Sequence, residues 1–100
     1  MDAELHITMP DGSVWAVPVE HIARSRAAFY AQREYGGDVE ESLRDDTIPI
    51  FESDDYEIKD WAAGNMDWDD VSQFARLVSN PEPPDFQEGW VNGKKRVVRK

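Results

Sequence analysis

The reverse turn at Pro10-Asp11-Gly12 constrains the fold of this chain more than any other local feature. Proline fixes φ and glycine accepts a positive φ, so these residues can turn the chain back on itself. Apolar and polar residues alternate before the turn, which is the period of a strand. Residues 4–19 are therefore predicted to form a β-hairpin that ends at Pro18. A loop that closes at the glycine gives these facing pairs: Met9 with Ser13, Ile7 with Trp15 and Leu5 with Val17.

Apolar residues at helical spacing predict a helix directly after the hairpin, over residues 19–35. Gly36-Gly37 follows, and glycine is typical of a helix end. Asp38 with Glu41 then forms a capping box, in which each side chain accepts a hydrogen bond from the backbone of the other residue. This box predicts a second, short helix over 38–45.

A further capping box, formed by Asp54 and Glu57, predicts a helix that stops at Gly64-Asn65. Another apolar stripe begins after Asp67 and ends at Asn80-Pro81, because the residue before a proline disfavours the helical conformation. These signals predict a pair of helices in the second half of the chain.

Extended segments are predicted at two more places. Thr47–Phe51 is apolar but contains a proline, which favours a connector or a short extended edge. Near the C-terminus, Phe86–Val91 and Lys94–Val98 flank Asn92-Gly93, a dipeptide that is typical of a two-residue hairpin turn. A C-terminal β-hairpin is therefore predicted.

The order of these elements predicts an α+β fold, with an N-terminal β-hairpin, about three helices and a C-terminal β-hairpin. Separate hairpins and a run of helices do not build the βαβ units of an α/β fold. The length of 100 residues fits one domain. The apolar face of the first hairpin is expected to pack on Ile22, Tyr30, Trp61, Val71, Phe74 and Val78.

Charge divides the chain into two parts. Residues 1–92 hold all 21 acidic residues and six of the 11 basic ones, so their net charge is −15. Residues 93–100 hold the other five basic residues, a net charge of +5. The expected organisation is a single acidic α+β domain over 1–92 and a basic C-terminal strand or tail over 93–100. The cations of this segment are expected to pair with the acidic body.

The acidic body limits the classes of partner. It repels nucleic acid and anionic membranes, so a protein partner with a basic surface is expected instead. The absence of cysteine excludes disulfides and thiolate ligands. No apolar segment approaches the roughly 18 residues that span a bilayer, and no secretion signal is recognised, so a cytoplasmic protein is expected.

No pattern of catalytic or metal-binding residues stands out. The histidines, His6 and His21, lack the spacing of metal ligands, and the acidic runs 52–57 and 67–70 lack the glycine of a calcium-binding loop. These carboxylates are expected to cap helix N-termini, where the helix dipole favours negative charge. Neither a G-x-S-x-G nucleophile motif nor a glycine-rich phosphate loop is present. A non-enzymatic protein without metal or cofactor is expected.

Two functions fit this pattern. The first is a small acidic interaction module that docks onto another protein through exposed aromatic residues. The alternative is a nucleic-acid mimic, whose carboxylates imitate phosphates and occupy the basic groove of a DNA- or RNA-binding protein. One contiguous acidic face favours the mimic, and scattered acids favour the module. The residues expected to bind the partner are Asp38, Glu40, Glu41, Asp45, Asp46, Glu52, Asp54, Asp55, Glu57 and Trp90.

Three stretches of the sequence carry a family resemblance. They are Met9-Pro10-Asp11-Gly12 with Trp15-Ala16-Val17-Pro18, Trp61-Ala62-Ala63-Gly64-Asn65-Met66-Asp67-Trp68, and Asp85-Phe86-Gln87-Glu88-Gly89-Trp90-Val91-Asn92-Gly93. Together they resemble small proteins encoded in phage and prophage genomes, over most of the chain. The resemblance implies a phage accessory protein that acts on a host or phage protein in a bacterial cytoplasm. It supplies no functional residues that could be carried over.

Overall fold

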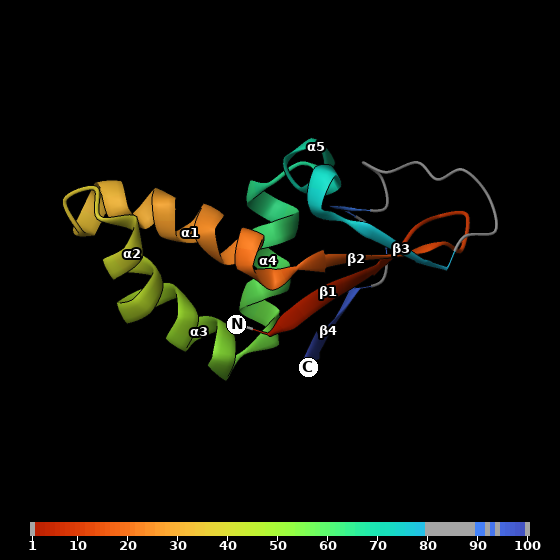
Figure 1. Ribbon diagram of the computed structural model, residues 1–100, viewed down its shortest axis with the longest axis horizontal. Coiled ribbons are helices and arrows are strands. Elements are labelled where there is room, and N and C mark those ends of the chain that lie inside the picture. The colour runs from red at the N-terminus through yellow and green to blue at the C-terminus, as the bar shows by residue number, and fades with distance from the viewer. Residues whose placement is uncertain (1, 80–89, 92, 94, 100) are drawn as a thin grey trace.

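The computed structural model describes residues 2–79, 90, 91, 93 and 95–99. Figure 1 shows the strands gathered towards one end of the longest axis and helices α1–α3 towards the other. The fold class is α+β, as predicted. The strands are β1 (Ala3–Thr8), β2 (Val14–Pro18), β3 (Arg76–Ser79) and β4 (Lys95–Arg99). The helices are α1 (Val19–Glu34), α2 (Val39–Ser42), α3 (Ile48–Ser53), α4 (Asp55–Asn65) and α5 (Trp68–Val71).

The N-terminal hairpin forms as predicted. β1 and β2 are antiparallel in the predicted register, with Leu5 opposite Val17. The N–H of Met9 donates a hydrogen bond to the carbonyl oxygen of Ser13 at 2.7 Å, which closes the turn. Gly12 has a φ of 85°, the left-handed conformation for which glycine was expected. Local turn chemistry and alternation are therefore sufficient to specify this hairpin.

The predicted C-terminal strand also forms, but it pairs with an unexpected partner. The strand order is β3-β2-β1-β4, so β4 lies beside β1, with Val97 opposite Leu5. Of the hairpin partner expected at Phe86–Val91, the structure describes Trp90 and Val91, and both are helical. The rest of that predicted strand, and most of its turn, lie outside the described residues.

The basic segment 93–100 is tied to the helices as well as to the sheet. Arg99 donates a hydrogen bond to the carbonyl oxygen of Phe51 at 3.0 Å and forms an ion pair with Asp55. Lys95 lies partly buried, and this burial lowers the pKa of its ammonium group. The expected pairing between the basic segment and the acidic body is therefore present at Arg99.

α1 matches the predicted helix and ends at the two glycines. Gly36 and Gly37 have φ values of 60° and 88°, and the N–H of Gly37 donates to the carbonyl oxygen of Ala31 at 2.8 Å. The left-handed turn reverses the chain, so that α2 packs back along α1 (Figure 1). The buried face of α1 consists of Val19, Ile22, Ala23, Ala27 and Ala31.

Replacing Gly37 with alanine should destabilise the protein by about 1 kcal/mol, because its φ of 88° disfavours an L side chain by roughly that amount. Gly64 is the matched control, since it lies inside α4 and a Cβ there would meet nothing within 4 Å. Gly64→Ala should instead stabilise the protein by roughly 0.5–1 kcal/mol. Urea unfolding measures both changes. Shifts of the same sign in the two variants would contradict this account of the turn.

The extended connector predicted at Thr47–Phe51 is wrong, because this segment is helical. The helix that begins as α2 continues through a π-helical turn into α3. In that turn the N–H of Ile48 donates to the carbonyl oxygen of Leu43. Pro49 follows and has no N–H to donate, and the wider turn before it lets the helix continue. Phe51 consequently reaches the core and is 0% exposed.

The long helix predicted after Asp67 is wrong beyond its first turns. The capping box between Asp67 and Asp70 forms, but α5 ends at Val71 and a single 3-10 turn follows. The chain then becomes β3 beside β2, where Arg76 donates two hydrogen bonds to the buried carboxylate of Glu4, at 2.8 and 3.2 Å. Pairing with β2 and the contact of Arg76 with the buried Glu4 stabilise the extended conformation of this segment, although its apolar residues have helical spacing.

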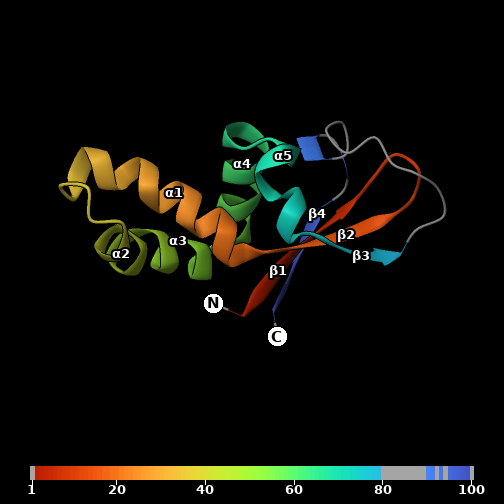
Figure 2. The same ribbon diagram turned by 45° about the horizontal axis from the view of Figure 1, so that its top comes forward.

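The core lies between the sheet and the helices, and Figure 2 shows α4 and α5 on one side of the sheet. Phe74 and Val78 are 41% and 46% exposed, so their predicted core positions are wrong. Trp90 is buried instead, with its ring 6.2 Å from that of Trp68 and its indole N–H donating to the Met66 carbonyl oxygen at 2.8 Å. The predicted core residues that are buried are Leu5, Ile7, Met9, Val17, Ile22 and Val71.

Candidate functional site

The charge divide of the sequence is also a divide in space. Residues 19–74, which run from α1 to the turn after α5, hold 15 acidic and five basic residues, a net charge of −10. The four strands hold one acidic and four basic residues, a net charge of +3. Because the strands lie together in the sheet (Figure 1), the acidic surface belongs to the helices.

Four of the nine carboxylates predicted to bind the partner are paired with arginines of the chain itself. The pair of Asp46 with Arg26 is largely shielded from solvent, and the other three pairs are exposed and add little stability. All four reduce the negative charge that a partner meets. The hydrogen bond from Arg44 also lowers the pKa of Asp45. The pairs are Glu40 with Arg24, Asp45 with Arg44, Asp46 with Arg26 and Asp55 with Arg99.

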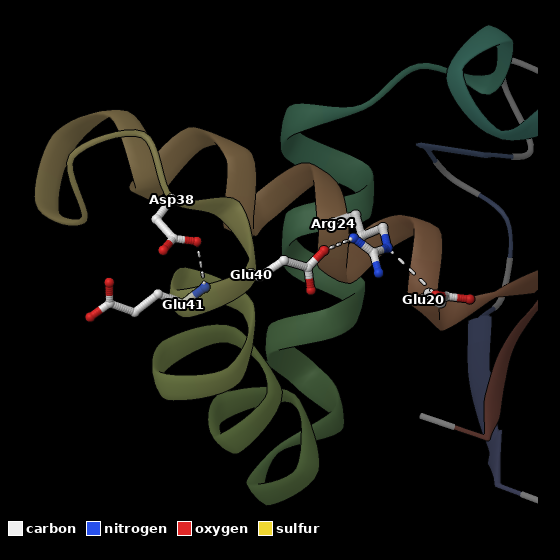
Figure 3. Close-up of polar contacts among 5 residues, drawn as sticks. All are labelled: Glu20, Arg24, Asp38, Glu40 and Glu41. Carbon is white, nitrogen blue, oxygen red and sulfur yellow. Dashed lines mark hydrogen bonds and ion pairs between the residues drawn. The ribbon is translucent and has the colours of Figure 1, made fainter.

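Figure 3 shows how the carboxylates at the start of α2 are engaged. The guanidinium of Arg24 lies 2.8 Å from Glu40 and 3.5 Å from Glu20, so it links α2 to α1. The hydrogen bond with Glu40 raises the pKa of Arg24. Asp38 accepts a hydrogen bond from the backbone N–H of Glu41 at 3.1 Å, which confirms Asp38 as a helix cap. The carboxylate of Glu41 points away from this group. The other half of the predicted capping box does not form, because the N–H of Asp38 donates to the carbonyl oxygen of Tyr35.

Asp54 is likewise a cap, because its side chain accepts a hydrogen bond from the N–H of Tyr56 at 2.9 Å. The predicted capping box with Glu57 does not form, because the N–H of Asp54 donates to the carbonyl oxygen of Ile50. The other three predicted carboxylates, Glu41, Glu52 and Glu57, form no ion pair with any residue that the structure describes. They come from α2, α3 and α4 respectively. The uncompensated negative charge is therefore spread over three elements of the helical part.

Trp90 cannot be the exposed aromatic anchor that the sequence suggests, and this prediction is wrong. Its ring is 0% exposed because it fills the space beside Trp68. Exposed aromatic side chains lie on α1 and α4, where Phe29 is 43% and Tyr56 is 64% exposed, and in the turn after α5, where Phe74 is 41% exposed. An aromatic contact with a partner would therefore involve the helical part of the chain.

A cavity of about 300 Å³ opens between α1 and α4. The two helices are joined beside it by the indole N–H of Trp61, which donates to Oγ of Ser25 at 3.1 Å. On each helix every lining residue has another three or four positions away, and residues at that spacing lie on one face of a helix. The lining includes Arg26, Phe29 and Tyr30 from α1, and Glu57, Asp60 and Trp61 from α4.

The aromatic rings of this pocket form one cluster. Their centroids are separated by 5.1 Å for Phe29 and Tyr30, 5.5 Å for Phe29 and Trp61, and 6.1 Å for Tyr30 and Trp61. Guanidinium groups lie over two of the rings, Arg26 over Tyr30 and Arg33 over Phe29, each 4.5 Å from the centroid. The cluster thus already makes cation–π contacts within the chain.

The carboxylates of the pocket are not neutralised by the cation that shares its lining. Glu57 and Asp60 form no ion pair with any described residue. The guanidinium of Arg26 is directed elsewhere, since it donates to Oγ1 of Thr47 at 3.0 Å and lies 3.4 Å from the carboxylate of Asp46. The pocket therefore combines accessible aromatic surface with two uncompensated negative charges.

The sheet presents a surface of the opposite character. A cavity of about 380 Å³ there is lined by His6, Thr8, Val14, Lys95 and Arg96. His6 lies opposite Arg96 in the sheet, and its Nε2 is 3.5 Å from the carboxylate of Glu4. This basic surface is unsuited to the cationic partner that the helices would attract.

No family model matches the sequence, and comparisons with curated proteins and with solved structures find no match. Among the described residues, no three His, Asp or Glu side chains are grouped as a metal site would require. In that same part of the chain, no helix is both long and apolar enough to cross a membrane.

Of the residues that line this pocket, only Glu57 is predicted from the sequence to bind the partner. The spacing of the lining residues along the sequence does indicate which of them lie on the same helix face. Arg26 and Phe29 are three residues apart, as are Glu57 and Asp60, so each pair shares a helix face. The spacing does not reveal that these two faces meet, because that depends on how α1 packs against α4.

Proposed function

We propose that this protein is a small, non-enzymatic interaction module that binds a partner protein through a basic surface of that partner. The observation that carries the proposal is the net charge of −10 on residues 19–74, combined with an aromatic pocket in the same helices. Negative potential attracts a basic partner over long range, and aromatic side chains supply the contact area of interface cores. The resemblance to phage-encoded proteins supports a host or phage protein in the bacterial cytoplasm as the partner.

Nucleic-acid mimicry is the less favoured alternative. A mimic of duplex DNA needs a dense row of carboxylates, because DNA carries about one charge per 1.7 Å of its axis. Most of the predicted carboxylates are committed within the chain, so few remain to imitate phosphates. Those paired with arginine are Glu40, Asp45, Asp46 and Asp55, and those that cap helices are Asp38 and Asp54.

Reversing the charge of a residue tests its part in attracting the partner. The residue must have no structural role, so that the change does not also affect folding. Asp54 and Asp55 are unsuitable, because the first caps α4 and the second pairs with Arg99. Glu41 and Glu52 are suitable, since both lie on the helical surface and neither forms an ion pair with a described residue.

The double variant Glu41→Lys and Glu52→Lys should associate with a captured basic partner roughly tenfold more slowly, with little change in dissociation. The matched control, Asp2→Lys and Asp69→Lys, changes the net charge equally but leaves α2 and α3 intact, so it should retain most of the association rate. Surface plasmon resonance at low and high salt measures both. The difference should shrink at high salt, because salt shortens the Debye length from about 10 Å at 0.1 M.

Equal slowing by both double variants would contradict a binding surface on α2 and α3, since total charge alone would then control association. A partner whose association rate is unaffected by salt and by either variant would contradict recognition of a basic surface.

A further inference from the structure

We propose that the pocket between α1 and α4 receives an arginine side chain of the partner, with the guanidinium over the ring of Trp61 and its N–H groups directed to Glu57 and Asp60. This inference rests on the proposed function and names the chemical group that the interface recognises. The cavity of about 300 Å³ lies at the lower end of the range for small-ligand sites, as expected for a single side chain.

The chain itself displays the preference of these rings for guanidinium groups. Arg26 lies over Tyr30 and Arg33 lies over Phe29, both at 4.5 Å from the ring centroid. Among the described residues, no guanidinium lies over Trp61, the third ring of the cluster. Tryptophan attracts cations more strongly than phenylalanine or tyrosine does. The ring best suited to a cation is therefore the one over which no described guanidinium of the chain lies.

The carboxylates select a cation with several donors. Glu57 and Asp60 are three residues apart in α4, on the wall that also carries Trp61, and neither is paired with a described residue. Like charges at this spacing repel each other, and a cation between them relieves the repulsion. A planar guanidinium can stack on a ring and donate hydrogen bonds at its edge, whereas the compact ammonium of lysine cannot do both. The pocket therefore favours arginine over lysine.

The pocket is also held in place before a partner arrives. The hydrogen bond from Trp61 to Ser25, at 3.1 Å, fixes the indole between the two helices. Contacts with Asp46 and Thr47 hold Arg26, so this cation is kept from the pocket carboxylates. Binding would then require little ordering of side chains, which preserves affinity.

An NMR titration of the full chain with the acetylated, amidated peptide Gly-Arg-Gly tests the proposal. The peptide should shift the indole N–H of Trp61 and the amides of Glu57 and Asp60, with saturation in the millimolar range. Its citrulline analogue is neutral and nearly isosteric, and it should bind at least about tenfold more weakly because charge-assisted hydrogen bonds are lost. The lysine analogue should also bind more weakly than the arginine peptide.

Two double variants separate the pocket from general electrostatics. Glu57→Gln with Asp60→Asn removes both pocket charges at nearly constant shape and should weaken arginine binding by about tenfold. Asp2→Asn with Asp69→Asn removes the same number of charges elsewhere and should leave the affinity within about twofold. The amide spectrum of each variant reports whether it remains folded.

Saturable shifts at Trp61 that require the guanidinium and the pocket carboxylates would support the proposal. Equal binding of the citrulline or lysine analogue, the absence of saturable Trp61 shifts, or equal weakening by both double variants would overturn it. The association experiment with Glu41→Lys and Glu52→Lys is independent of these results. If the peptide titration fails, recognition of a basic surface by the helices still stands. If only the association experiment fails, the proposed function is wrong, and binding of arginine in the pocket still stands.

Discussion

Truncating Trp90 to alanine should destabilise the protein by about 3–5 kcal/mol, much of the margin of 5–15 kcal/mol that is typical of native proteins. The side chain is 0% exposed and packs beside Trp68, so its loss leaves a large cavity. The truncation also removes the donor to the Met66 carbonyl oxygen, now 2.8 Å from the indole nitrogen. Thermal unfolding followed by circular dichroism measures the loss.

Phe74→Ala is the informative comparison, because helical periodicity predicts Phe74 as a core residue and a similar loss on truncation. In the structure Phe74 is 41% exposed and stacks on His21, with ring centroids 3.6 Å apart. Its truncation should therefore cost only about 1 kcal/mol. If Phe74→Ala were the more destabilising change, the short α5 and the buried position of Trp90 would both be wrong.

Removing residues 93–100 should destabilise the protein by on the order of 5 kcal/mol, because β4 supplies the second partner of the interior strand β1. Five residue pairs join these strands, from Ala3 with Arg99 to Ile7 with Lys95. Their loss would leave one edge of β1 without hydrogen bonds and would uncover apolar residues that are now buried. Urea unfolding should show a greatly reduced or absent cooperative transition.

Arg96→Thr is the control for charge, because it removes a cation from an exposed position of β4 and keeps a residue that favours strands. The stability of this variant should stay within about 0.5 kcal/mol of the original chain. A truncated chain with an unchanged melting temperature would mean that the basic segment is a dispensable tail.

The elements that could be predicted from the sequence are those specified by neighbouring residues. The first hairpin depends on the turn at Pro10-Asp11-Gly12, and α1 depends on an apolar stripe that two glycines end. The caps at Asp38 and Asp54 likewise act on N–H groups within three residues of them. Such short-range features are complete within a single stretch of sequence.

Most of the predictions that failed depend on residues distant in the chain. β3 replaces the expected end of a helix, where Arg76 meets Glu4 across 72 positions. β4 pairs with β1, almost the whole length of the chain away. One failure is local, because the helical path through Pro49 depends on a π-helical turn that no sequence motif indicates. The spacing of apolar residues describes each segment alone, and it contains no information about contacts with segments distant in the chain.

The candidate site shows the same division. The sequence predicts the acidic character of the helices, because charge is additive along the chain. It does not predict which carboxylates are neutralised, since Arg24 and Arg26 reach partners on other elements. The pocket depends on the packing of α1 against α4, which brings Phe29 beside Trp61. The loss of Trp90 as an anchor follows from burial that spacing alone does not indicate.

The proposed function requires negative potential to be concentrated on the helices rather than on the sheet. Near-surface potentials at individual amides, measured by NMR from the relaxation caused by cationic and anionic paramagnetic cosolutes, test this claim most directly. We expect strongly negative potentials along α2, α3 and α4, and much weaker or positive ones along β4. Equal potentials over the helices and the sheet would contradict it.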